Sequence, residues 1–101
     1  MEKLFQDRIA VTLDFSKSAS VSDLYGEMRD KMKWKSWYAE NLDALWDILT
    51  GLPYYGADFK IIRPRVFSDP LLTRKADAIC DIFFEAQERF GKITADIDYV
   101  D

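Results

Sequence analysis

The sequence contains no histidine among its 101 residues. Histidine is the commonest general base near neutral pH and the commonest metal ligand, so its absence excludes Ser-His-Asp and Cys-His nucleophile systems and zinc sites built on histidine. The sequence also lacks a Gly-x-Gly-x-x-Gly motif and a Walker-type phosphate loop, and we expect no cofactor. One enzymatic alternative stays open, in which Asp43, Asp47 and Glu85 bind a divalent cation or act as an acid/base pair.

Cysteine and long apolar runs are also scarce. Cys80 is the only cysteine, which excludes an internal disulfide, and the apolar helical pattern around it predicts a buried, unreactive thiol. No apolar run is long enough to cross a bilayer, and the N-terminus lacks the apolar core of a signal peptide. We therefore expect a cytoplasmic protein that has no membrane partner.

Basic residues are outnumbered, with 14 Lys and Arg against 18 Asp and Glu, a net charge of −4 and a sequence pI near 4.8. Nucleic-acid binding depends on Lys and Arg that neutralise phosphates, so nucleic acid is not an expected partner, whereas a basic protein is. A hydrophobic fraction of 49% with 15% aromatic residues indicates a packed globule. The length fits a single domain over residues 1–101, and we expect it to be a monomer when free.

Alternating apolar residues predict strands over residues 9–15 and 93–99. A third strand is predicted by the nearly continuous run of Phe59, Ile61 and Ile62, which is typical of a strand covered on both faces. Helical spacing predicts a helix over residues 21–32 and a second that ends at Gly51. The resulting order is strand, helix, helix, strand, helix, strand.

The last predicted helix is the longest, with apolar residues in helical register from Leu72 to Phe90. Asp69 before Pro70 fits an N-cap and first helical position, while Thr73 is an alternative cap for a later start. Gly91 is predicted to end the helix. Strands joined by helical crossovers indicate an α/β fold with a three-stranded, largely parallel sheet packed with three to four helices.

The segment from residue 37 to 51 carries two stripes of opposite character. Apolar residues occupy one predicted helical face (Leu42, Leu45, Trp46 and Leu49), and carboxylates occupy a second (Glu40, Asp43 and Asp47). No Lys or Arg occurs between Lys35 and Lys60, so these carboxylates require either a cation distant in sequence or an external partner. Trp37 and Tyr38 lie just upstream, and aromatic anchors beside charges are common in protein interfaces. The residue types alone leave an interface and a solvated helix face equally favoured.

At these residues the chain resembles a known family. The run Tyr38-Ala-Glu-Asn-Leu-Asp-Ala-Leu-Trp-Asp-Ile-Leu-Thr-Gly51 closely resembles the hallmark segment of the barstar family, the intracellular inhibitors of the secreted ribonuclease barnase. Weaker similarity extends over Ser22 to Leu24 and Ile82 to Ala86. The last strand follows a glycine both in this chain and in the family. The family fold is a three-stranded parallel sheet with helices, which agrees with the order predicted above.

The resemblance implies inhibition by occlusion of a ribonuclease active site. Asp47 would be the central mimic of the substrate phosphate, Asp43 would pair with a basic residue at the cleft rim, and Glu85 would support that contact. Trp46 would be mainly a core residue with an edge near the interface. The remaining residues that we expect to bind the partner are Trp37, Tyr38, Glu40, Gly51 and Leu52.

Several positions depart from the family pattern. Trp37 replaces a tyrosine, Leu52 replaces an aromatic residue, and Ala39 replaces a glycine whose backbone freedom the loop could require. These differences surround the carboxylates and bear on which partner is recognised. We therefore consider two hypotheses: an inhibitor or immunity protein, not an enzyme, for a barnase-like or toxin ribonuclease, or a barstar-like domain for a basic partner that is not a ribonuclease. Elsewhere, a basic cluster is expected to be solvated surface (Arg63, Arg65, Arg74 and Lys75).

Overall fold

The computed structural model describes residues 9–32, 34, 39–51 and 56–100. Its elements follow one another as β1 (Ile9–Asp14), α1 (Val21–Lys31), α2 (Leu42–Gly51), β2 (Ala57–Arg63), α3 (Pro70–Phe90) and β3 (Ile93–Tyr99). The predicted order is confirmed, and so is the α/β fold.

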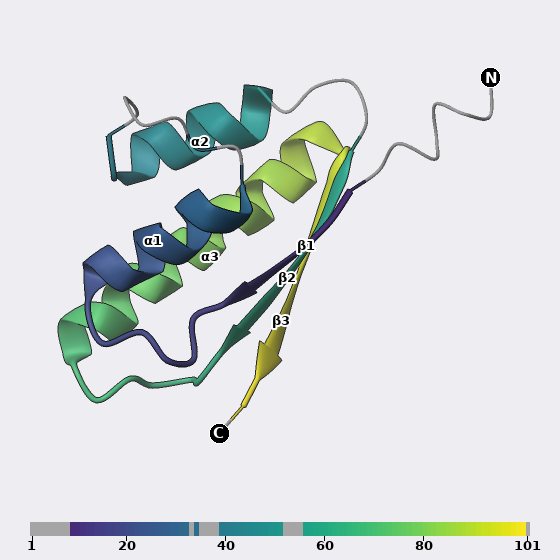
Figure 1. Cartoon of the computed structure of the whole chain (residues 1–101). Helices are drawn as coiled ribbons and strands as arrows, with labels where there is room; N and C mark the ends of the chain where they lie inside the picture. Colours follow the sequence, from purple (N-terminus) through teal and green to yellow (C-terminus); the bar gives the residue numbers. More distant parts are fainter. Residues whose placement is uncertain (1–8, 33, 35–38, 52–55, 101) are drawn as a thin grey trace, which may run out of the picture.

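The three strands form one sheet in the order β1-β2-β3, and both neighbouring pairs are parallel. Figure 1 shows α1, α2 and α3 on one side of the sheet, which is seen nearly edge-on. Parallel strands are joined by right-handed crossovers, so strands that are added in a single direction place every crossover on the same face. The described helices therefore cover only one face.

The prediction that β2 is covered on both faces is wrong. Ala57, Phe59 and Ile61 alternate with exposed Asp58 and Lys60, while Ile62 is half-buried on the open face. The adjacent isoleucines suggested burial on both faces, but Ile62 points to the face that the described helices leave open. That side is otherwise polar, with Asp58 accepting a hydrogen bond of 2.7 Å from the Thr94 hydroxyl.

The core lies between the helix-covered face of the sheet and the three helices. Phe59 of β2 meets Phe83 of α3 edge-on, with ring centroids 4.9 Å apart. Cys80 is buried in this layer, and burial raises the pKa of its thiol even though the Arg63 guanidinium lowers it. The thiol is therefore protonated at neutral pH, as expected of an unreactive cysteine.

The predicted ends of α3 are confirmed. The Asp69 side chain accepts a hydrogen bond of 2.9 Å from the Leu71 amide, and Pro70 occupies the first turn. Thr73 is not the cap, since its hydroxyl accepts from the Phe67 amide at 2.8 Å instead. At the other end Gly91 adopts a left-handed conformation with φ of 65°, which glycine reaches without steric cost.

Arg63 is not part of a solvated basic cluster. It ends β2 with the same parity as Phe59 and Ile61, so its side chain points into the covered face and is only 2% exposed. Arg65 is exposed, but its guanidinium lies 4.4 Å from the centroid of the Tyr99 ring. The prediction of solvated surface is therefore wrong for Arg63, which is buried, whereas Arg74 is exposed as expected.

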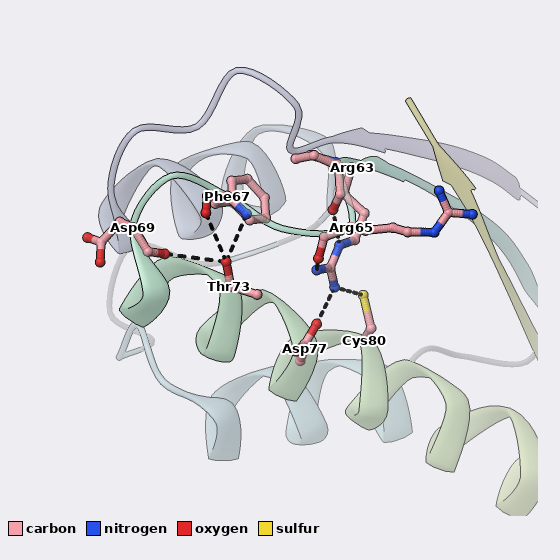
Figure 2. Close-up of polar contacts among 8 residues, drawn as sticks. Arg63, Arg65, Phe67, Asp69, Thr73, Asp77 and Cys80 are labelled. Carbon is pink, nitrogen blue, oxygen red and sulfur yellow. Dashed lines mark hydrogen bonds and ion pairs between the residues drawn. The ribbon is translucent and has the colours of Figure 1, made fainter. Parts of the chain in front are cut away.

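Figure 2 shows how the Arg63 guanidinium ties the start of the β2–α3 connection to α3. Nε donates to the Pro64 carbonyl at 2.9 Å, and Nη2 donates to the Arg65 carbonyl at 3.0 Å. Nη1 lies 2.8 Å from Asp77 Oδ1 and 3.6 Å from Cys80 Sγ. The charge is thus buried with a hydrogen-bond partner for each of its three nitrogens, as a buried charge requires.

Candidate functional site

The candidate site is centred on α2, whose start is fixed by Asn41. The Asn41 side chain accepts a hydrogen bond of 2.8 Å from the Ala44 amide, so it satisfies a helix N-terminal donor as an N-cap does. The apolar side of α2 is buried in the core, with Leu45 and Leu49 at 0% and 2% exposure. Because one side is packed this way, the opposite side of α2 is held towards solvent.

Asp43 and Asp47 occupy that opposite side, and both are exposed. They are four residues apart on a helix, which places their Cβ atoms about 6 Å from each other. Within residues 9–32, 34, 39–51 and 56–100, neither carboxylate forms an ion pair or accepts a hydrogen bond. We call these two residues the acidic ridge.

Glu40 differs from the acidic ridge in two ways. It precedes α2 rather than lying within it, because the helix begins after the Asn41 cap. Its Oε2 also accepts from Arg29 Nη1, so an arginine of α1 supplies the sequence-distant cation that the acidic segment lacks. The expectation of a third carboxylate on the same helical face is therefore wrong for Glu40.

Glu85 is also paired. It lies on the exposed side of α3, with Oε2 3.3 Å from the Nε of Arg89 one turn later. We call Arg29–Glu40 and Arg89–Glu85 the two rim pairs. The described carboxylates predicted to bind the partner thus fall into two classes: two on α2 have no partner within the described ranges, and two are paired with arginine.

At the α2–α3 junction, α2 packs against the last residue of α3. Trp46 of α2 is half-buried and contacts Phe90, the last residue of α3, with ring centroids 5.7 Å apart. Glu85 and Arg89 are five residues and one residue before Phe90, on the last turns of the same helix. The expectation that Trp46 is mainly core is thus refined: it packs on a neighbour that is 44% exposed.

The loop before α2 is anchored at its described ends. Trp34 is buried at 7% exposure and meets the Tyr25 ring of α1 edge-on, with centroids 5.8 Å apart. Ala39 is exposed, and Asn41 caps the helix. Three predicted partner-binding residues lie outside the described residues: Trp37, Tyr38 and Leu52.

Gly51 closes α2 and is exposed. A Cβ added at this position would meet no atom of the described residues within 4 Å, so their packing does not demand glycine here. A partner contact at Gly51 stays a prediction.

A metal-binding interpretation gains no support. Among the described residues, which include Asp43, Asp47 and Glu85, no three acidic or cysteine side chains gather as a metal ion would need.

None of the described helices is long and apolar enough to span a bilayer.

Three residues of the site were missed by the sequence reasoning. Arg29 was not linked to Glu40 because that pairing depends on how α1 packs against the start of α2, and Arg89 was not linked to the site because its position depends on how α3 packs against α2. A partial signal existed for Arg89, which follows Glu85 by four residues, the spacing of a helical ion pair. Phe90 was assigned to the apolar stripe of α3, although it is the last residue before Gly91 and therefore sits at a helix end.

Comparisons with known proteins agree with this geometry. The family model described as "Barstar (barnase inhibitor)" matches residues 9–100. The chain is also 32% identical over 81 residues to a Bacillus subtilis (strain 168) protein named "Putative ribonuclease inhibitor YrdF", and the alignment covers 77% of this chain and 85% of that protein. The region matched by the family model includes α2, the acidic ridge and both rim pairs.

Proposed function

Because the chain belongs to the barstar family, we propose that it is a protein inhibitor that binds and occludes the active site of a ribonuclease. In this proposal the chain is not an enzyme, and it acts in the cytoplasm on a barnase-like or toxin-type ribonuclease. The partner is basic and the chain is acidic, so their opposite fields would accelerate encounter, as they do for the barnase–barstar pair, the standard example of such steering.

The observation that most directly supports this proposal is that Asp43 and Asp47 have no ion-pair partner among the described residues. Like charges four residues apart on a helix destabilise it by about 0.2–0.5 kcal/mol. Arginines reach Glu40 and Glu85, yet none of the described residues neutralises the acidic ridge. Two exposed carboxylates on a fixed helix match the needs of a cleft built from cations to hold a phosphodiester. Carboxylates satisfy such donors and offer no bond to cleave.

The test combines capture with inhibition. The immobilised chain is exposed to the secreted basic proteins of its source, and each retained protein is assayed for hydrolysis of RNA with and without the soluble chain. We expect retention of a ribonuclease whose activity the chain suppresses. Barnase, the enzyme named in the family description, is the first purified ribonuclease to assay in parallel.

Matched variants locate the binding surface. We expect Asp43→Ala and Asp47→Ala to weaken inhibition by about 100-fold or more, because each leaves a partner cation desolvated without its carboxylate. Asp98→Ala makes the same charge change on the open face of the sheet and should inhibit like the wild type. Equal inhibition by all three variants would contradict the proposal. A retained basic protein that depends on Asp47 but does not cleave RNA would favour the second hypothesis instead.

A further inference from the structure

The two rim pairs give the proposed docking surface a definite charge pattern. Among the described residues the two carboxylates of the acidic ridge have no ion-pair partner, whereas Glu40, just before α2, and Glu85, on α3, each pair with an arginine. Arg29 lies on α1 and pairs with Glu40 just before α2, whereas Arg89 lies on the last turn of α3 beside the α2–α3 junction. The surface is therefore negative at its centre and of both signs at its rim.

Both arginines remain available to a partner. A guanidinium carries five N–H donors, and within the described part of the chain each of these two uses one nitrogen for its glutamate: Nη1 for Arg29 and Nε for Arg89. The Arg29 side chain is 43% exposed and the Arg89 side chain 64%. Arginine can bind a second carboxylate through a free edge of its planar fork, which makes it a frequent anchor in interfaces.

Stability of the free chain gives little reason for these pairs. Exposed ion pairs contribute little to folding because water screens them and both side chains lose freedom. If the two arginines served to neutralise repelling surface carboxylates, we would expect them to pair with Asp43 and Asp47, which repel each other on one helix. The arginines stand at the rim instead.

We propose that Arg29 and Arg89 are partner-contacting, specificity-determining residues, and that the partner offers carboxylates around a cationic cleft. This inference rests on the proposed function and specifies the partner of the same surface. A ribonuclease with cations at both the cleft and the rim meets repulsion from the two arginines. One with acidic rim residues gains a charge-assisted hydrogen bond at each of them.

The experiment uses the ribonuclease that the wild-type chain retains and the Asp47→Ala chain does not. Dissociation constants are measured by a biosensor for wild type, Arg29→Ala, Arg89→Ala and Arg74→Ala. Arg74 is the matched control, because it is exposed on α3, forms no ion pair with any described residue, and its loss changes the net charge equally. We expect binding to weaken about tenfold for each rim arginine and to stay unchanged for Arg74→Ala.

A double variant separates contact from neutralisation. If Arg89 acted only by neutralising Glu85, then Arg89→Ala combined with Glu85→Ala would bind like the wild type. We expect the double variant to stay at least as weak as Arg89→Ala. Tighter binding of the single arginine variants, unchanged binding, or recovery in the double variant would each overturn the inference while leaving the proposed function intact. Failure to find any retained ribonuclease whose binding depends on Asp47 would instead overturn the proposed function.

Discussion

Replacing Arg63 with alanine tests what holds the β2–α3 connection in place. The substitution removes the donors to the Pro64 and Arg65 carbonyls and leaves a void where the 2% exposed side chain packs. Hydrogen bonds from a charged donor are worth about 1.5–3 kcal/mol each, and stranded carbonyls keep their desolvation cost. Allowing for overlap between these contributions, we expect the free energy of unfolding to fall by about 4 kcal/mol, the range seen when a buried charged network is broken.

The ion pair with Asp77 contributes a smaller share of that loss. The Asp77 side chain is 58% exposed, so water screens its attraction to the guanidinium even though Arg63 itself is buried. We expect Asp77→Ala to cost about 1 kcal/mol or less. Arg63→Met keeps most of the apolar stem while removing every donor, and its cost should fall between the other two, at about 2–3 kcal/mol.

The assay is equilibrium unfolding in urea, followed by tryptophan fluorescence and analysed by linear extrapolation. A chain of this size has a total stability of about 5–15 kcal/mol, so Arg63→Ala can leave little folded protein. Arg63→Met and Asp77→Ala keep the comparison measurable in that case. An equal loss of unfolding free energy in Asp77→Ala and Arg63→Met would refute the reasoning. The ion pair with Asp77 would then contribute more than the hydrogen bonds to the two carbonyls.

Three further outcomes are expected from single sites. Asn41→Ala should lower the free energy of unfolding by about 1 kcal/mol in urea, whereas Asn41→Asp keeps the cap and should not. Hydrogen bonds from the Ser16 hydroxyl and amide hold the pKa of Asp14 below its usual value. The ionised Asp14 therefore stabilises the fold above its ordinary pKa of about 4, and this stabilisation is lost as the pH falls below that value. The difference in free energy of unfolding between wild type and Asp14→Asn, measured in urea, should shrink from pH 7 to pH 2. Cys80 should react with a thiol reagent only on unfolding; rapid labelling of the native chain would contradict its burial.

Apolar periodicity was enough to predict most of the fold. Strand and helix order, the N-cap at Asp69 and the stop at Gly91 are local signals, and local signals are present in a single sequence. The sheet faces were harder, because the side on which a helix packs depends on crossover handedness and strand order. The adjacent Ile61 and Ile62 therefore suggested two-sided burial where the described helices cover only one side.

Arg63 shows that one missed feature did leave a signal in the sequence. It continues the alternation of Phe59 and Ile61, and strict parity alone would have placed it on the covered face. The competing rule, that charged residues stay at the surface, was given precedence and was wrong. A charged residue in register with a buried stripe is better treated as a candidate buried network.

In the site, too, features set by local spacing could be predicted, whereas features set by the packing of helices could not. The acidic ridge could be predicted because Asp43 and Asp47 share one helical face, and spacing determines that directly. The Arg29–Glu40 pair could not, since it joins residues 11 apart through the packing of α1 against the start of α2. The Glu85–Arg89 pair has the spacing of a helical ion pair, but its place beside the α2–α3 junction depends on tertiary packing. Roles for Trp37, Tyr38 and Leu52 stay predictions, because those residues lie outside the described part of the chain.

If the acidic ridge is kept for binding and not for folding, then removing its repulsion should make the free chain more stable. Asp47→Lys places a base four residues after Asp43, the favourable order for a helical pair, in a helix that has no basic residue in its last turn. Lost repulsion and gained attraction together should raise the free energy of unfolding by about 0.5–1 kcal/mol. Asp47→Asn removes only the repulsion and should give about half of that. Both variants should bind the ribonuclease target more weakly, and Asp47→Lys more so than Asp47→Asn. A stability loss in Asp47→Lys would mean that Asp47 stabilises the free chain, and the ridge would then no longer indicate a surface kept unpaired for a partner.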